Sequence, residues 1–122
     1  MGKILLKDGL VDRDFVENHT ERFQGYLAAL DAFSLEWLAS QCAIPLEDVR
    51  KLALMYGSTK PASIWAGWGL QRREYGAEIY RLLDALAAIT GKLGVPGGGV
   101  SHGRVGRECG GWGVRAPEAA WV

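Results

Sequence analysis

Glycine residues mark the two places where this chain must turn tightly. The stretch at residues 67–72 reads GWGLQR, which combines two glycines with an indole, a planar amide and a guanidinium. It lies between a short apolar run and a long segment with helical spacing, and a glycine triplet at 97–99 follows that segment. Glycine lets a backbone approach a ligand closely, and a strand-to-helix turn directs its amides at phosphate groups. We therefore expect this turn to contact a large, flat, phosphate-bearing ligand.

The segments on either side of this turn have clear signatures. Apolar residues recur at the spacing of one helix face between about residues 76 and 90, which predicts a helix that Gly91 ends. This face consists of Ile79, Leu82, Leu83, Leu86 and Ile89. Residues 62–66, ASIWA, are apolar and bounded by turn residues, which predicts a buried strand with Trp65 in the core.

The first sixty residues predict a series of short helices. Asp12, Thr20 and Ser34 each precede a helical pattern and are expected to cap it. Pro45 suits the first turn of a fourth helix, which Gly57 is expected to end. The predicted buried faces contain Phe23, Tyr26, Leu27 and Leu30 in the helix after Thr20, and Val49, Leu52, Ala53 and Tyr56 in the fourth helix.

One strand alone leaves this inventory incomplete, because a single strand cannot satisfy its own backbone hydrogen-bonding groups. Either residues 3–6 or residues 100–105 supply a partner strand, or the chain is part of a larger protein; we favour the second alternative. The predicted fold class is a helix-rich α/β arrangement. It is a partial Rossmann-like domain in which short N-terminal helices precede a strand–turn–helix unit.

The composition argues against several classes of function. The 122 residues suffice for one small domain, and 14 basic residues balance 14 acidic ones, so nothing predicts a nucleic-acid partner. No apolar run approaches the roughly 20 residues that span a bilayer, so no membrane span is expected. The apolar run at the N-terminus is too short for a signal peptide, which predicts a cytoplasmic chain, although a parent protein could be periplasmic.

The reactive side chains form neither a metal site nor a catalytic set. Cys42, Cys109, His19 and His102 are isolated from one another and lack the spacing of metal ligands. Cys42 is expected to be buried and Cys109 to be accessible. Because no nucleophile, histidine and acid can be combined, we predict no catalytic residue, and any chemistry lies elsewhere or on a cofactor.

The GWGLQR turn has more than one interpretation. It opens like a dinucleotide-binding fingerprint, but Arg72 stands where the third glycine is required. Trp68 is a candidate for the core as well as for binding, and Gln71 and Arg72 are a solvated turn if they bind nothing. The glycine triplet is either a flexible linker or a site of close backbone approach to another segment or a ligand.

Five stretches, taken in order, carry a family resemblance. They are residues 9–20 (GLVDRDFVENHT), 34–37 (SLEW), 44–50 (IPLEDVR), 67–72 (GWGLQR) with Gly76, and 84–100 (DALAAITGKLGVPGGGV). With this order and spacing, the chain resembles an internal segment of the catalytic subunits of molybdopterin oxidoreductases, the dimethyl sulfoxide reductase superfamily. The resemblance runs over roughly residues 4–103. Residues 1–103 are therefore assigned to a fragment of the catalytic domain, and 104–122 to an unmatched tail.

The resemblance implies a bis(molybdopterin guanine dinucleotide) cofactor with molybdenum or tungsten, at which oxygen-atom, hydride or electron transfer occurs. It implies that Trp68, Gly69, Gln71 and Arg72 lie near the pterin or its phosphates. The family's iron–sulfur cysteine cluster, metal-ligand segment and C-terminal cofactor domain have no counterpart in this sequence. The chain alone is therefore expected to hold no cofactor and to be inactive, with the remainder of the catalytic subunit and electron-transfer subunits as partners.

Two other functions stay open at the level of sequence. One is a small stand-alone interaction domain that binds a protein partner through the aromatic, glycine-rich turn. The other is a divergent nucleotide-binding domain of another enzyme. In each case the predicted helix at 76–90 is apolar on more than one face, so we also expect exposed apolar surface and self-association.

Overall fold

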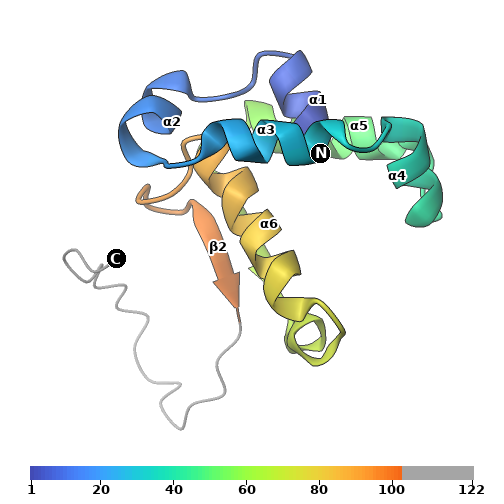
Figure 1. Cartoon of the computed structure of the whole chain (residues 1–122). Helices are drawn as coiled ribbons and strands as arrows, with labels where there is room; N and C mark the ends of the chain where they lie inside the picture. Colours follow the sequence, from blue (N-terminus) through green and yellow to red (C-terminus); the bar gives the residue numbers. More distant parts are fainter. Residues whose placement is uncertain (103–122) are drawn as a thin grey trace, which may run out of the picture.

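The computed structural model describes residues 1–102 and shows helices gathered around one strand–helix–strand unit (Figure 1). The helices before this unit are short, as the sequence predicts. In chain order the elements are α1 (Gly2–Lys7), α2 (Arg13–His19), α3 (Phe23–Asp31), α4 (Leu35–Gln41), α5 (Leu46–Ser58), β1 (Ser63–Ala66), the 3-10 helix η1 (Trp68–Arg72), α6 (Gly76–Ile89) and β2 (Gly99–His102).

The sheet consists of two parallel strands within the described residues. β1 pairs with β2 from Ser63 opposite Gly99 to Ala66 opposite His102, and α6 forms the crossover between them. The predicted strand at 62–66 is confirmed, and so is a partner at 100–102; residues 103–105 lie outside the described part. The alternative partner at 3–6 is wrong. That segment is the helix α1, and the prediction failed because an apolar run this short does not separate helix from strand by its periodicity.

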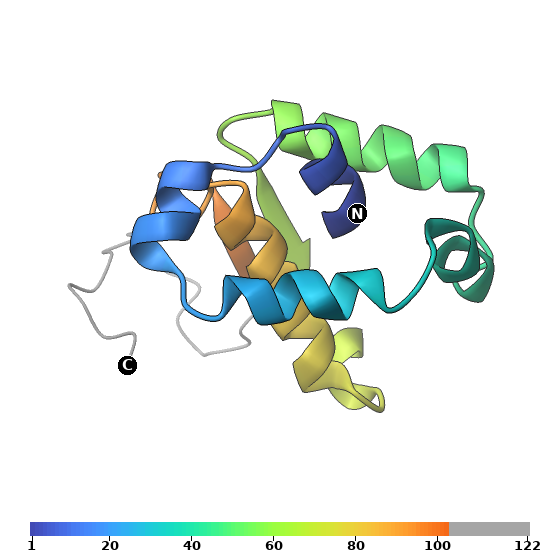
Figure 2. The ribbon, with the colours of Figure 1, turned by 45° about the horizontal axis from the view of Figure 1, so that its top comes forward.

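The core joins elements from both ends of the chain. Leu5, Val16, Tyr56, Leu86 and Ile89 form one buried cluster, contributed by α1, α2, α5 and α6. Figure 2 shows α1 lying between α3 and α5. α6 contacts both β2 and α2, so the N-terminal helices and the sheet share this core.

Two of the three predicted helix caps are present in the structure. Asp12 and Ser34 are confirmed, since their side chains accept hydrogen bonds from the backbone N–H of Phe15 and Trp37. Thr20 is not a cap of α3. It ends α2 instead, and its hydroxyl donates to the carbonyl of Val16 at 2.6 Å, while α3 begins after Arg22.

The fourth helix differs from its prediction in two respects. α5 follows Pro45 as expected, but it continues through Gly57 to Ser58. A Cβ atom at Gly57 would overlap the side chains of Leu5 and Leu10, so this glycine permits α1 to pack closely. Of the predicted buried face, Ala53 and Tyr56 are buried, whereas Leu52 is 48% exposed.

Candidate functional site

The predicted strand–turn–helix unit is present, with a 3-10 turn at its centre. The backbone N–H of Leu70 donates to the carbonyl of Gly67 at 3.2 Å, and the N–H of Arg73 donates to the carbonyl of Leu70 at 3.4 Å. The turn does not continue into α6, because Arg73 is extended and Tyr75 has a left-handed φ of 59°. The expected break between β1 and the helix at 76–90 is therefore confirmed.

The four predicted binding residues lie together on this turn, immediately after the carboxyl end of β1. Trp68, Gly69, Gln71 and Arg72 are all exposed. Within residues 1–102, Arg72 forms no ion pair. A Cβ atom at Gly69 would meet no atom within 4 Å, so the backbone here is open to approach. The turn therefore offers an indole, an amide and a guanidinium on an accessible backbone.

Two contacts that the sequence analysis missed hold this turn against α6. The hydroxyl of Tyr80 donates to the carbonyl of Gly67 at 3.3 Å. A Cβ atom at Gly76 would lie 3.3 Å from the Cα of Gln71, which is closer than most side chains allow. The spacing of Gly76 and Tyr80, one helical turn apart on one face of α6, was the available signal. Together they fix the turn on the first turns of α6.

The glycine triplet forms a packed turn within the protein. Gly97 and Gly99 have φ values of 79° and 88°, which other residues rarely adopt. A Cβ atom at Gly98 would overlap the carbonyl oxygen of Lys92. Of the interpretations considered, close backbone approach to another segment of the chain is therefore the correct one.

Lys92 is a buried cation that the sequence did not reveal. Its side chain is 0% exposed, although no acidic partner accompanies it in the described residues. Its ammonium lies 3.5 Å from the carbonyl oxygen of Gly57 at the end of α5 and 4.7 Å from the ring centre of Tyr56. Burial lowers the pKa of Lys92, and the nearby charge of Lys60 lowers it further. Burial also raises the pKa of Tyr56.

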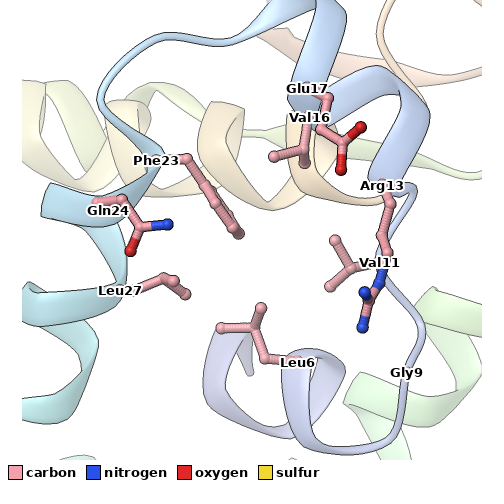
Figure 3. Close-up of a pocket in the computed structure, with 9 residues that line it drawn as sticks. All are labelled: Leu6, Gly9, Val11, Arg13, Val16, Glu17, Phe23, Gln24 and Leu27. Carbon is pink, nitrogen blue, oxygen red and sulfur yellow. The ribbon is translucent and has the colours of Figure 1, made fainter.

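At least two cavities among the described residues lie away from the turn. One, of about 390 Å³, opens between α1, α2 and α3, and Figure 3 shows Leu6 and Phe23 pointing into it, with Arg13, Glu17 and Gln24 also lining it. The second is an apolar groove of about 480 Å³ beside β1. Neither contains a residue of the GWGLQR turn.

Of the remaining predictions about reactive and aromatic residues, two are wrong and one lies outside the described residues. Cys42 is exposed, so the expectation of a buried thiol is wrong; it lies at the end of the short surface helix α4. Trp65 is 65% exposed rather than buried, because its side chain alternates with those of Ile64 and Ala66, which face the core. Cys109 lies outside the described residues. Residues 1–102 contain no cluster of potential metal ligands and no helix long and apolar enough to cross a membrane.

Comparison with known proteins gives a consistent set of relatives. The dimethyl sulfoxide/trimethylamine N-oxide reductase of Cereibacter sphaeroides is 35% identical over 105 residues, which cover 81% of this chain and 13% of that protein. The trimethylamine-N-oxide reductase of Haemophilus influenzae is 34% identical, over 78% of this chain and 12% of that protein. Formate dehydrogenase H of Escherichia coli is 33% identical, over 83% of this chain and 14% of that protein.

The relatives are much longer than this chain. The chain spans about an eighth of the length of the curated relatives it matches. No family model matches the chain. The five sequence stretches and these relatives indicate the same family. The chain, which matches one segment of these longer relatives, therefore belongs to the molybdopterin oxidoreductases of the dimethyl sulfoxide reductase superfamily.

Proposed function

We propose that this chain supplies part of the surroundings of a bis(molybdopterin guanine dinucleotide) cofactor in a molybdenum- or tungsten-dependent oxidoreductase. The observation that carries the proposal is the turn after β1, which exposes Trp68, Gly69, Gln71 and Arg72 side by side. Ligands of open α/β sheets bind beyond the carboxyl ends of parallel strands, and this turn occupies that position. When bound, the cofactor supplies oxygen-atom, hydride or electron transfer at its metal.

The residues of the turn fit such a group chemically. The guanidinium of Arg72 presents paired N–H donors to phosphate or pterin oxygens. The amide of Gln71 offers a donor and an acceptor to the pterin edge. The indole of Trp68 supplies a flat surface beside them, and the open backbone at Gly69 allows close approach. In this proposal the chain alone retains no cofactor, because the turn forms only one side of the binding site.

The fold supports the same proposal. A parallel pair joined by a crossover helix is the unit from which Rossmann-like domains are built, and we propose that β1, α6 and β2 belong to one. The proposed partners are the remainder of the catalytic subunit and electron-transfer subunits. The division at residue 103 and a cytoplasmic location stay predictions.

A chimera tests the cofactor role. The homologous segment of the Cereibacter sphaeroides reductase is replaced by this chain, and the purified protein is assayed for molybdenum, pterin and reduction of trimethylamine N-oxide. Arg72→Gln is expected to lower cofactor retention about 10-fold or more, since hydrogen bonds to charged groups contribute about 1.5–3 kcal/mol. The isolated chain, expressed in the same host, is expected to carry no stoichiometric molybdenum.

The matched control is Arg81→Gln, which removes the same charge from an exposed position further along α6. It is expected to leave cofactor content unchanged. Equal retention in the Arg72 and Arg81 variants would remove the turn from the binding site. A stoichiometric metal content in the isolated chain would contradict the idea that the chain forms only one side of the site.

A further inference from the structure

The apolar groove beside β1 has a shape and chemistry that the proposed cofactor role does not use. Its walls come from Met1, the C-terminal half of α5, the segment between α5 and β1, the start of β1 and the middle of α6. Leu52 and Met55 of α5 are 48% and 62% exposed, so apolar surface is open along this groove. No Asp, Glu, Lys, Arg or His side chain lines the groove. Met1, Thr59 and Ser63 also line the groove, but most of its lining is apolar, so an apolar occupant fits it best.

The sheet beside the groove is incomplete in the described residues. β1 and β2 pair only with each other, and no third strand joins either of them within residues 1–102. Parallel sheets occur with both faces covered and ordinarily have more than two strands. Ser63 and Ile64 belong to β1 and also line the groove. The groove therefore reaches the start of β1, the strand that an added strand would pair with.

We propose that this groove and the adjoining edge of β1 form the docking surface for an uncharged, apolar strand from the remainder of the catalytic subunit. This inference rests on the proposed function, because it takes the same larger protein as the source of the strand. The matched relatives have about seven-eighths of their length outside the region that corresponds to this chain, so such a strand is available in sequence. Pairing with β1 satisfies backbone groups, while the strand's side chains fill the space between Leu52, Met55 and Leu83.

Lysine substitutions in the groove separate docking from folding. Met55→Lys and Leu52→Lys are made in the isolated chain and in the Cereibacter sphaeroides chimera. Both side chains are largely exposed, so the isolated variants are expected to keep the melting temperature of the parent chain within about 3 °C, a shift that corresponds to well under 1 kcal/mol. In the chimera each buried lysine lacks a partner, and the soluble yield is expected to fall at least 10-fold.

The matched control is Gln41→Lys, which adds the same charge at an exposed polar position at the end of α4. The soluble yield of the chimera with this change is expected to equal that of the unmodified chimera. Hydrogen exchange followed by mass spectrometry on residues 61–67 adds a second readout. The amides of β1 are expected to exchange at least 10-fold more slowly in the chimera than in the isolated chain, because a new strand protects them.

The outcomes distinguish this inference from the proposed function. An unmodified chimera that fails to accumulate or holds no molybdenum shows that this chain does not replace the reductase segment. That result counts against both the proposed function and the docking surface. A chimera that works and tolerates the groove lysines as well as Gln41→Lys overturns the docking surface alone. Unchanged exchange in β1 overturns strand pairing, and marked destabilisation of the isolated Met55→Lys chain shows that the groove is already filled.

Discussion

Lys60 and Asp12 are 48 residues apart in sequence, yet the ammonium of Lys60 donates to the Oδ2 atom of Asp12 at 3.2 Å. The other carboxylate oxygen of Asp12 accepts from the backbone N–H of Phe15, and the backbone N–H of Asp12 donates to the carbonyl of Ile89 at 2.8 Å. Asp12 therefore joins the start of α2, the segment before β1 and the end of α6. The hydrogen bond from Phe15, and then the contact with Lys60, lower the pKa of Asp12.

The first prediction concerns the charge of Asp12. Because its pKa is lower in the folded chain, its stabilising effect is complete above the ordinary pKa of aspartate and is lost as the pH falls through the lowered value. Asp12→Asn keeps a good helix cap but loses this dependence, whereas Asp12→Ala should cost about 0.5–2 kcal/mol at pH 7. Urea unfolding at pH 7 and pH 3 measures both effects. An Asn variant with the same acid sensitivity as the parent would show that Asp12 is not responsible.

The second prediction compares two glycines with left-handed φ. Gly91 and Gly94 have φ values of 62° and 73°, but only a Cβ atom at Gly91 would overlap the Asp12 carboxylate. Gly94→Ala should therefore lower the free energy of unfolding only by the backbone strain, about 1–2 kcal/mol. Gly91→Ala should cost more, about 3 kcal/mol or higher, because the Asp12 contacts must also shift. Thermal unfolding of both variants checks the difference, and equal losses would contradict the packing at Gly91.

The third prediction concerns the buried ammonium of Lys92. Burial lowers its pKa in the folded chain, so at pH values between the lowered value and that of free lysine the unfolded chain binds more protons. The free energy of unfolding should rise with pH in that window, and the rise should be smaller in Lys92→Met. A remainder is expected in that variant, because burial also lowers the pKa of the Met1 amino group. At pH 7, Lys92→Met should lie within about 1.5 kcal/mol of the parent chain because volume is conserved. Lys92→Ala should lose about 2–5 kcal/mol.

Urea unfolding between pH 7 and pH 9.5 measures this dependence below the range in which Tyr56 ionises in the unfolded chain. The raised pKa of Tyr56 acts in the opposite direction at higher pH, because the unfolded chain then loses its proton first. Parallel pH profiles for the parent and Lys92→Met would indicate that Lys92 is solvated in solution.

The fourth prediction is that the isolated chain self-associates. Leu82 and Met55 are 57% and 62% exposed, and the net charge of zero provides no general repulsion between copies. Light scattering at micromolar concentration should detect oligomers, and Met55→Lys should reduce them. A monodisperse chain that melts cooperatively and binds no hydrophobic dye would instead favour a complete interaction domain.

Local sequence signals predicted the elements whose partners are close in the chain. The helix α6 follows from five apolar residues at helical spacing, and the caps Asp12 and Ser34 act within their own first turns. The existence of the strand at 62–66 and of the turn after it was equally local. The helix and its caps were predictable because their contacts span only a few residues, whereas β1 is signalled by its own apolar run but pairs with β2, 36 residues later.

The errors arise where contacts with distant segments determine the conformation or burial of a residue. α1 is helical because Ile4 and Leu5 are buried in the core, and nothing within residues 3–6 shows this. The burial of Lys92 depends on Gly57 and Tyr56, which lie about 35 residues earlier. For the candidate site, the sequence located the turn and its four residues. The hydrogen bond from Tyr80 that anchors the turn could be recognised only in the folded structure.

The parallel register of the sheet also sets an order of events during synthesis. Ser63 pairs opposite Gly99, so β1 leaves the ribosome roughly 35 residues before its partner strand β2. At about 5–20 residues per second, this separation lasts roughly 2–7 s. Throughout that interval β1 lacks β2, although α1 to α5 have already emerged. The nascent chain is therefore most exposed to misfolding before α6 and the glycine turn appear, and slowing translation after residue 66 should lower its soluble yield.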